Sequence, residues 1–128
     1  MKVYVCLTVF SDSLSPEEMR NHIGIAGDET WKVGDKRGLT EILEKENGWS
    51  LCSELDNNLE LEAHIYQIMG VTKGGEDKLK MLSERDDCEV QLSCAIYCSS
   101  EPALFLEKKI ISWINSIGAS LDIDLYIS

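Results

Sequence analysis

Two aspartates near the end of the chain have the spacing that metal or proton chemistry needs. Asp122 and Asp124 stand two apart in an alternating segment, so their carboxylates project from one face of a strand. Such a pair can bind a metal ion or share a proton. The sequence offers no further ligand beside them. We expect no catalytic residue, no metal and no cofactor, and the alternative is an enzyme or small-molecule-binding module that uses Asp122, Asp124 and His64.

Three other candidates for chemistry have simpler structural explanations. His64 lies on a predicted helix beside its apolar face, where a hydrogen-bonded structural histidine is expected. The stretch G-D-K-R-G at residues 34–38 matches neither glycine motif for phosphate binding and is typical of a turn. Ser13 and Ser15 lack a spaced histidine and acid, and Ser15 fits the cap of a helix.

The cysteines indicate structural thiols rather than a redox or metal centre. Their number is odd and none forms a C-x-x-C pair; they are Cys6, Cys52, Cys88, Cys94 and Cys98. The last three fall on the apolar phase of one strand, where a free cysteine behaves as a small hydrophobe. A zinc site from Cys94, Cys98 and a histidine would lack the close ligand pairs of such sites. We therefore expect all the cysteines to be reduced.

The elements that position these residues are clearest in the last third of the chain. Apolar residues occupy every second position of residues 88–98, which predicts a half-buried strand. Two serines and Pro102 then indicate a helix start, and an apolar stripe continues to Gly118, as in an amphipathic helix of about four turns. Residues 121–127 alternate again and predict a last strand with one apolar and one polar face.

The first part of the chain begins with a similar strand and helix. Alternation predicts a strand at residues 3–9, and the capping box that starts at Ser15 predicts a short helix ending at Gly24. This plan of strand, serine cluster, proline-started helix and strand occurs at both ends of the chain. A duplicated strand-helix-strand unit is therefore one interpretation.

The middle of the chain is expected to add a hairpin and two helices. Short strands around Trp31 and Trp49 are expected to pair antiparallel, with a charged helical turn at residues 39–47 between them. Helices are predicted at residues 61–69 and 76–84. All the tryptophans are expected in the core or at its edge.

These elements predict an α+β fold in one domain of residues 1–128. A central antiparallel sheet of four to five strands would place the first strand, the strand at 88–98 and the last strand side by side. Helices would pack mainly on its apolar face. The other face would carry tyrosines, hydroxyls and the two aspartates, and it is the first place to look for a partner.

The charge of the chain limits its partners. The net charge is −11, from 12 basic and 23 acidic residues. Such a field repels nucleic acid and attracts a basic protein. No segment has the length of a membrane span or the pattern of a signal peptide. We expect a cytoplasmic protein that binds neither nucleic acid nor a membrane.

Several short motifs together resemble a known family. They are S-D-S-L-S-P-E-E at residues 11–18, W-K-V-G-D at 31–35, W-S-L-C-S at 49–53, L-E-A-H at 61–64 and G-A-S-L-D-I-D-L-Y at 118–126. Over nearly the whole chain they resemble the bacterial family called domain of unknown function 4279. Its members are small and intracellular, without an assigned enzymatic activity, and some look like immunity genes of toxin loci. The resemblance carries over no catalytic residue, and the charged insertion at residues 39–47 departs from the family pattern.

The leading hypothesis is therefore a non-enzymatic interaction protein, an immunity protein that binds a toxin domain such as a basic nuclease. Acidic groups would steer the encounter, and aromatic side chains would hold the complex. The expected contacts are Asp28, Glu29, Glu84, Asp86, Asp87, Glu89, Tyr97 and Tyr126. We expect a monomer or a weak homodimer. A third hypothesis is a regulatory module that dimerises through an exposed strand edge.

Overall fold

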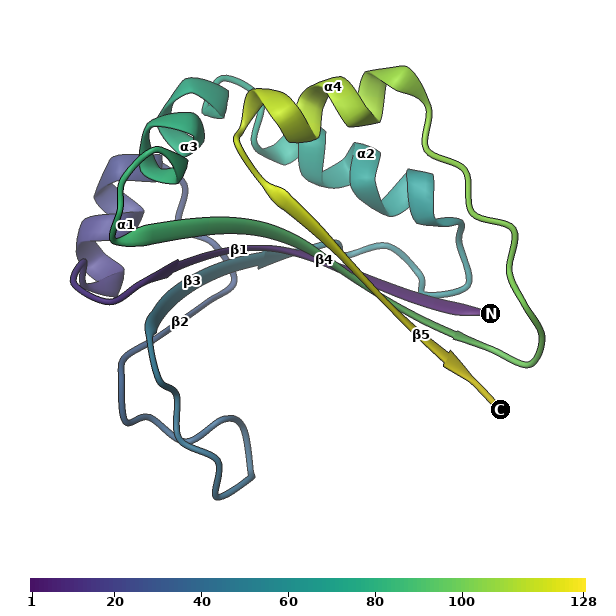
Figure 1. Cartoon of the computed structure of the whole chain (residues 1–128), viewed down its shortest axis with the longest axis horizontal. Helices are drawn as coiled ribbons and strands as arrows, with labels where there is room; N and C mark the ends of the chain where they lie inside the picture. The colour runs from purple at the N-terminus through teal and green to yellow at the C-terminus, as the bar shows by residue number, and fades with distance from the viewer.

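The computed structural model describes residues Met1–Ser128 and contains one mixed five-stranded sheet with helices on one of its faces (Figure 1). The strand order is β2-β3-β1-β4-β5. The strands are β1 (Lys2–Ser11), β2 (Glu29–Trp31), β3 (Asn47–Cys52), β4 (Cys88–Cys98) and β5 (Ser120–Ile127). The helices are α1 (Pro16–Ile23), α2 (Leu61–Val71), α3 (Glu76–Ser83) and α4 (Lys108–Ser116). The α+β prediction, with the sheet covered on one face, is confirmed.

The antiparallel pair of β1 and β4 forms the centre of the sheet. The register runs from Lys2 opposite Tyr97 to Ser11 opposite Cys88, along the whole of β1. Side chains alternate between the two faces of a strand, so every second residue points toward the helices. Those residues are buried; they are Val3, Val5, Leu7, Val9, Val90, Leu92, Cys94 and Ile96. The period of two in the sequence predicted both strands and their buried faces.

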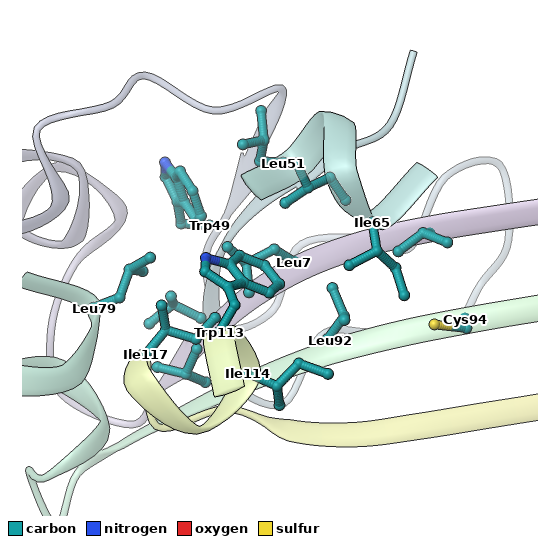
Figure 2. Packing of buried hydrophobic residues seen from close by; sticks show 14 of the residues in the cluster. Leu7, Trp49, Leu51, Ile65, Leu79, Leu92, Cys94, Trp113, Ile114 and Ile117 are labelled. Carbon is teal, nitrogen blue, oxygen red and sulfur yellow. The ribbon is translucent and has the colours of Figure 1, made fainter. Parts of the chain in front are cut away.

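The helices close the core over that face. α1 packs on β3, α2 on β1 and α3 on β4, while α4 packs on α2 and α3. Trp49, Leu79 and Trp113 belong to the core cluster between these layers (Figure 2). Trp49 is fully buried, and its Nε1 donates to the carbonyls of Ile25 and Ala26 at 3.0 and 3.1 Å. Burying each such apolar side chain contributes roughly 1.5–3 kcal/mol. No helix has both the length and the apolar content to cross a membrane.

The sequence signals at α1 appear in the structure as predicted. The Ser15 hydroxyl accepts a hydrogen bond from the Glu18 amide, and the Glu18 carboxylate accepts one from the Ser15 amide. Gly24 follows the helix with φ 78°, in the left-handed region that glycine adopts without strain. The capping box and the final glycine therefore define both ends of this helix.

The sheet is mostly antiparallel, as predicted, but β5 pairs with β4 in parallel, so the antiparallel prediction is wrong at this one strand. A parallel neighbour requires the chain to return along the length of the sheet before pairing. The eleven residues of β4 span about 36 Å, whereas the nine residues of α4 span only about 14 Å. Residues 99–107 cover the difference without helical structure. The predicted helix start at Pro102 is therefore wrong, and α4 begins at Lys108.

The predicted duplication of a strand-helix-strand unit is confirmed only in part. In both β1-α1-β2 and β4-α4-β5 a helix joins two strands of the same direction, since β2 is antiparallel to β3 and β3 to β1. However, β3 lies between β1 and β2, whereas β5 contacts β4 directly. The two units therefore share a connection but not a strand pairing.

The apolar face of β5 is less covered than its alternation suggested. Leu121, Leu125 and Ile127 are 39%, 45% and 52% exposed, although they point toward the helical side of the sheet. Only Ile123 packs against the core. The cause is the position of α4, which packs on other helices. The edge strand β5 therefore has three apolar side chains exposed to solvent.

The segment between β2 and β3, residues 32–46, forms an irregular arm. It contains a single bridge between Lys36 and Leu43, and the predicted helical turn at residues 39–47 is absent. Glycines at 34 and 38 have φ 91° and 58°, which turns the chain where a helix would need to continue. The arm leaves the sheet on the side opposite the helices (Figure 1).

Two glycine substitutions test the local backbone and packing. Gly70 lies inside α2 with open space where a Cβ would point, whereas Gly118 has φ 68° and its Cβ would collide with the Ser83 hydroxyl. We expect Gly70→Ala to raise the free energy of unfolding by about 0.5–1 kcal/mol because alanine loses less backbone entropy. Gly118→Ala is expected to lower it by at least about 1–2 kcal/mol.

Urea unfolding of both variants beside the wild type checks this pair. Equal effects of the two changes would contradict the assigned backbone at α2 and at the turn before β5.

Candidate functional site

No helix lies on the face of the sheet opposite α1–α4, and only the arm extends over one end of it (Figure 1). We call it the open face. Its residues are those on the other phase of each strand: Lys2, Tyr4, Cys6, Thr8, Phe10, Glu29, Trp31, Gly48, Ser50, Cys52, Glu89, Gln91, Ser93, Ala95, Tyr97, Ser120, Asp122, Asp124 and Tyr126. Among the strand residues of this face, four carboxylates stand against one lysine. The open face is therefore acidic, with aromatic rings at both ends.

Three tyrosines form a cluster at one end of the open face. Tyr97 stacks on Tyr126 with ring centroids 4.6 Å apart, and Tyr4 meets Tyr97 edge-on at 5.9 Å. Each ring is nearly half exposed. The Tyr4 hydroxyl accepts a hydrogen bond from the Asn57 amide at 3.0 Å, which holds this ring in place. Rigid, half-exposed aromatic rings give large contact area at low entropic cost, as protein-binding surfaces require.

The other end of the open face is the floor of a cavity of about 930 Å³ beneath the arm. Phe10 and Trp31 form its apolar part, with ring centroids 6.3 Å apart. Trp31 lies across Gly48 so closely that a Cβ there would overlap the indole ring. The indole Nε1 of Trp31 is buried without a hydrogen-bond partner. Glycine at position 48 is thus required for this ring position.

The arm supplies the charged wall of this cavity. Arg37 Nε donates to Glu44 at 2.8 Å, and Lys36 lies 3.2 Å from Glu41. The bond to Glu44 raises the pKa of Arg37. Within each pair the two charges neutralise each other. The pairs therefore stabilise the conformation of the arm and add no net charge to it. The cavity accordingly combines an aromatic floor with groups of both charges, within the usual size range of small-molecule sites.

Three carboxylates crowd the edge of the open face beside Phe10. Burial raises the pKa of Glu46, and the negative charges of Asp12 and Glu89 raise it further. Of the predicted contacts, Glu89 belongs to this group. The three carboxylates repel one another and give this edge a negative potential, and a bound cationic group would reduce the repulsion.

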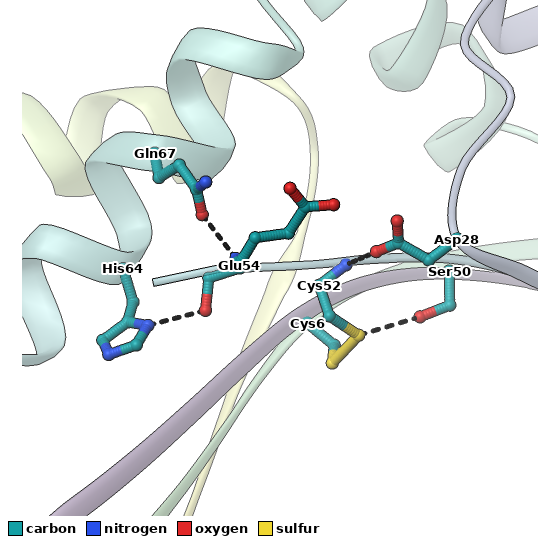
Figure 3. The surroundings of a disulfide bond; sticks show 8 residues. Cys6, Asp28, Ser50, Cys52, Glu54, His64 and Gln67 are labelled. Atoms are coloured by element: carbon teal, nitrogen blue, oxygen red, sulfur yellow. Dashed lines mark hydrogen bonds between the residues drawn. A yellow bond between two sulfur atoms is a disulfide. The ribbon is translucent and has the colours of Figure 1, made fainter. Parts of the chain in front are cut away.

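Asp28 and Glu29 line the cavity under the arm, as two of the predicted contacts. The Asp28 carboxylate accepts a hydrogen bond from the Cys52 amide at 2.5 Å, so it fixes the strand edge as well (Figure 3). Glu29 points to the open face opposite Ser50 and remains exposed. These two acids therefore lie beside the aromatic floor, although only Glu29 is free of a structural bond.

The turn between α3 and β4 holds the other predicted acids. Asp87 is engaged: Arg85 donates to both of its oxygens at 2.8 and 2.9 Å, and the Ser13 hydroxyl donates to it as well. These bonds hold the pKa of Asp87 well below its usual range. Glu84 and Asp86 are exposed and have no ion-pair partner. The eight predicted contacts thus divide among the open face, the cavity beneath the arm and this turn.

The alternative site is not assembled in the structure. Asp122 and Asp124 lie on the open face, opposite Ser93 and Ala95. His64 is buried on α2, which covers the other face; its Nδ1 lies 2.6 Å from the Ser53 hydroxyl (Figure 3). Burial lowers the pKa of His64. This histidine ties the loop after β3 to α2, which is the predicted structural role, and no cluster of three potential metal-ligating side chains occurs in the chain.

The cysteine prediction is wrong at one pair. Cys6 and Cys52 stand directly opposite on β1 and β3 and form a disulfide on the open face (Figure 3). The bond closes a separation of 46 residues, a contact that local sequence patterns cannot reveal. Cys88, Cys94 and Cys98 are free, as predicted, and burial raises the pKa of Cys94 to about 12, so it stays a thiol.

Sequence reasoning overlooked several residues of this surface. Trp31 was expected in the core or at its edge and Phe10 had no predicted role, yet both form the cavity floor. The phase of each strand is the signal that identifies such residues, since Phe10 shares the parity of Tyr4 and Thr8. Lys36 and Arg37 had no such signal, because the arm follows no period.

The crowded carboxylates predict a pH-dependent stability. The pKa of Glu46 in the folded chain is above the ordinary value of 4.5, so ionised Glu46 destabilises the fold at neutral pH. Glu46→Gln is expected to raise the Tm at pH 7, and this gain should shrink as the pH falls through the raised pKa and vanish below 4.5. Glu101→Gln, in the exposed segment before α4, is the control and should leave the Tm unchanged. A gain that persists at pH 4 would contradict the account.

The disulfide predicts a redox-dependent stability. Closing a loop of this length restricts the unfolded chain and stabilises the fold by up to about 4 kcal/mol. We expect dithiothreitol to lower the Tm of the wild type and of Cys88→Ser equally. The double variant Cys6→Ser with Cys52→Ser should start at the lower Tm and show no response to the reductant. A wild-type Tm that is the same with and without reductant would contradict the bond.

The comparisons with known proteins agree with the resemblance seen in the sequence motifs. The family model described as domain of unknown function (DUF4279) matches residues 1–128. No curated protein and no solved structure matches the chain. The match spans the arm, the tyrosine cluster and the whole sheet, so the chain belongs to the DUF4279 family.

Proposed function

We propose that this chain is a non-enzymatic interaction protein whose open face binds another protein. The observation that carries the proposal is the uncovered sheet face itself, with aromatic rings at both ends and carboxylates between them. A sheet face with no functional partner is usually polar throughout, whereas exposed aromatic clusters mark binding surfaces. The tyrosine cluster supplies the apolar contact that such a complex needs.

The partner that fits this surface is basic. The chain has a net charge of −11, and the strands of the open face carry four of its carboxylates against Lys2 alone. Long-range attraction raises the association rate, and buried aromatic contacts slow dissociation. A toxin domain with a basic active site, such as a nuclease, has the required charge. The proposed role is therefore that of an immunity protein that covers such a site.

The proposed location is the cytoplasm, where a toxin of this kind acts. Cellular thiols keep most cysteines reduced there. Six residue pairs join β1 to β3 by backbone pairing, which does not need the bond. We therefore expect the open face to keep its shape in either redox state, and the proposal does not depend on the disulfide.

The experiment is co-expression of this chain with the C-terminal domain encoded by the adjacent upstream gene, followed by a pull-down and a growth test. A tight complex and rescued growth are the expected results. Tyr97→Ala with Tyr126→Ala should weaken the complex by about ten-fold or more, mainly through faster dissociation. Absence of both complex and rescue would reject the immunity role.

A matched pair of charge changes locates the surface. Asp122→Asn with Asp124→Asn and Glu84→Gln with Asp86→Asn remove two negative charges each, the first from the open face and the second from the turn before β4. We expect the first pair to slow association more than the second, with the larger difference at low salt. Asp87 is left intact because it bonds Arg85 and Ser13. A greater loss at Glu84 and Asp86 would place the interface at the turn.

The cavity beneath the arm supports a second candidate function, the binding of a small polar molecule. Its volume of about 930 Å³ and its aromatic floor suit a planar ligand that carries both charges. Such a ligand should raise the Tm and quench the fluorescence of Trp31. Gly48→Ala displaces Trp31 and should abolish both effects. A ligand whose effects survive this change binds elsewhere.

A further inference from the structure

β5 is the long free edge of the sheet. It pairs with β4 alone, so the backbone groups on its outer side have no strand partner along Ser120–Ile127. The opposite edge, β2, has only three residues and continues into the arm. A free edge of this length is a template for another strand. The two edges of this sheet therefore differ greatly in what they can accept.

β5 lacks most of the features that protect such edges. It contains no proline and no lysine, and its register with β4 continues without a bulge. Leu121, Leu125 and Ile127 remain 39–52% exposed on its helical side. An added strand with apolar residues on that side would cover them. The exposed apolar side chains and the unpaired backbone of β5 thus both indicate that another strand can bind there.

The charges of β5 select which strand can be added. Asp122 and Asp124 lie on the open-face side. A symmetric antiparallel pairing of two copies centred on Ile123 would place Asp122 of each copy opposite Asp124 of the other. Like charges directly opposite destabilise a strand pair, whereas opposite charges stabilise it. The two aspartates therefore disfavour a second copy in this register and favour a strand with basic residues on the same side.

We propose that β5 binds a partner strand in which apolar and basic residues alternate, which extends the sheet by one strand. The apolar residues cover Leu121, Leu125 and Ile127, and the basic residues face Asp122 and Asp124. Main-chain hydrogen bonds supply affinity, and the alternation supplies specificity. The inference rests on the proposed function and specifies how a basic partner protein engages this chain.

The test uses the wild-type chain and a synthetic peptide, Thr-Val-Lys-Val-Lys-Val-Lys-Val-Thr. One control peptide has glutamate in place of lysine, and a second has the same composition with its lysines grouped together. Fluorescence anisotropy gives the affinities, and amide hydrogen exchange maps the contact. The alternating lysine peptide should bind at least about ten-fold more tightly than either control, and the outward amides of β5 should exchange more slowly.

Charge variants of the chain test whether Asp122 and Asp124 attract the lysine peptide. Asp122→Asn with Asp124→Asn should weaken binding of the lysine peptide by roughly three- to ten-fold, whereas Glu84→Gln with Asp86→Asn should change it by less than about two-fold. Equal affinity for the lysine and glutamate peptides, or β5 amides left unprotected by the lysine peptide, would overturn the inference. A toxin complex that forms with β5 unprotected would overturn it too, while leaving the proposed function intact. Peptide binding at β5 without a toxin complex would support the added strand and reject the immunity role.

Discussion

The alternation of apolar and polar residues along β1 and β4 is the constraint on which the rest of this structure depends. Their ten-residue antiparallel register turns one phase of each strand toward the helices and the other toward solvent. A slip of one residue would exchange the two sets, exposing Leu7 and Leu92 and burying Tyr97. The loss of so much apolar burial makes such a slip prohibitive. The same pairing thus determines both the core and the composition of the open face.

The proposed binding function uses the strand residues that point away from the core. All helices lie on one side, and the arm alone extends over the other (Figure 1). The aromatic residues left on that side are held in place: Tyr97 stacks on Tyr126 and meets Tyr4 edge-on, and Trp31 lies on Gly48. Preorganised groups lose little entropy on binding. A rigid sheet with an acidic, aromatic face therefore suits the proposed binding of a basic protein.

Local patterns in the sequence predicted what depends on neighbouring residues. The period of two identified β1 and β4, the capping box identified α1, and the apolar phase identified the free cysteines. Contacts between distant residues were not predictable in this way. The disulfide of Cys6 joins residues 46 apart, and the direction of β5 depends on how the chain crosses between strands. Pro102 suited a helix start locally, but the length of β4 required an extended return.

The same distinction applies to the site. Tyr97 and Tyr126 were predictable because strand phase places them on the open face. Trp31 was not, because its position over Gly48 depends on the pairing of two short strands. Asp87 resembled a free acid in the sequence, yet tertiary contacts with Ser13 and Arg85 engage it. A carboxylate's availability depends on such contacts, and one sequence does not reveal them.

Hydroxyl-radical footprinting of the chain, alone and in complex with the upstream-encoded domain, tests most directly whether the partner covers the open face. Tyr4, Tyr97 and Tyr126 should lose most of their reactivity in the complex. Met81 and Phe105, which are 68% and 70% exposed outside the open face, should keep theirs. Protection of Met81 or Phe105 with the three tyrosines still reactive would contradict the account, because the partner would then occupy a different surface.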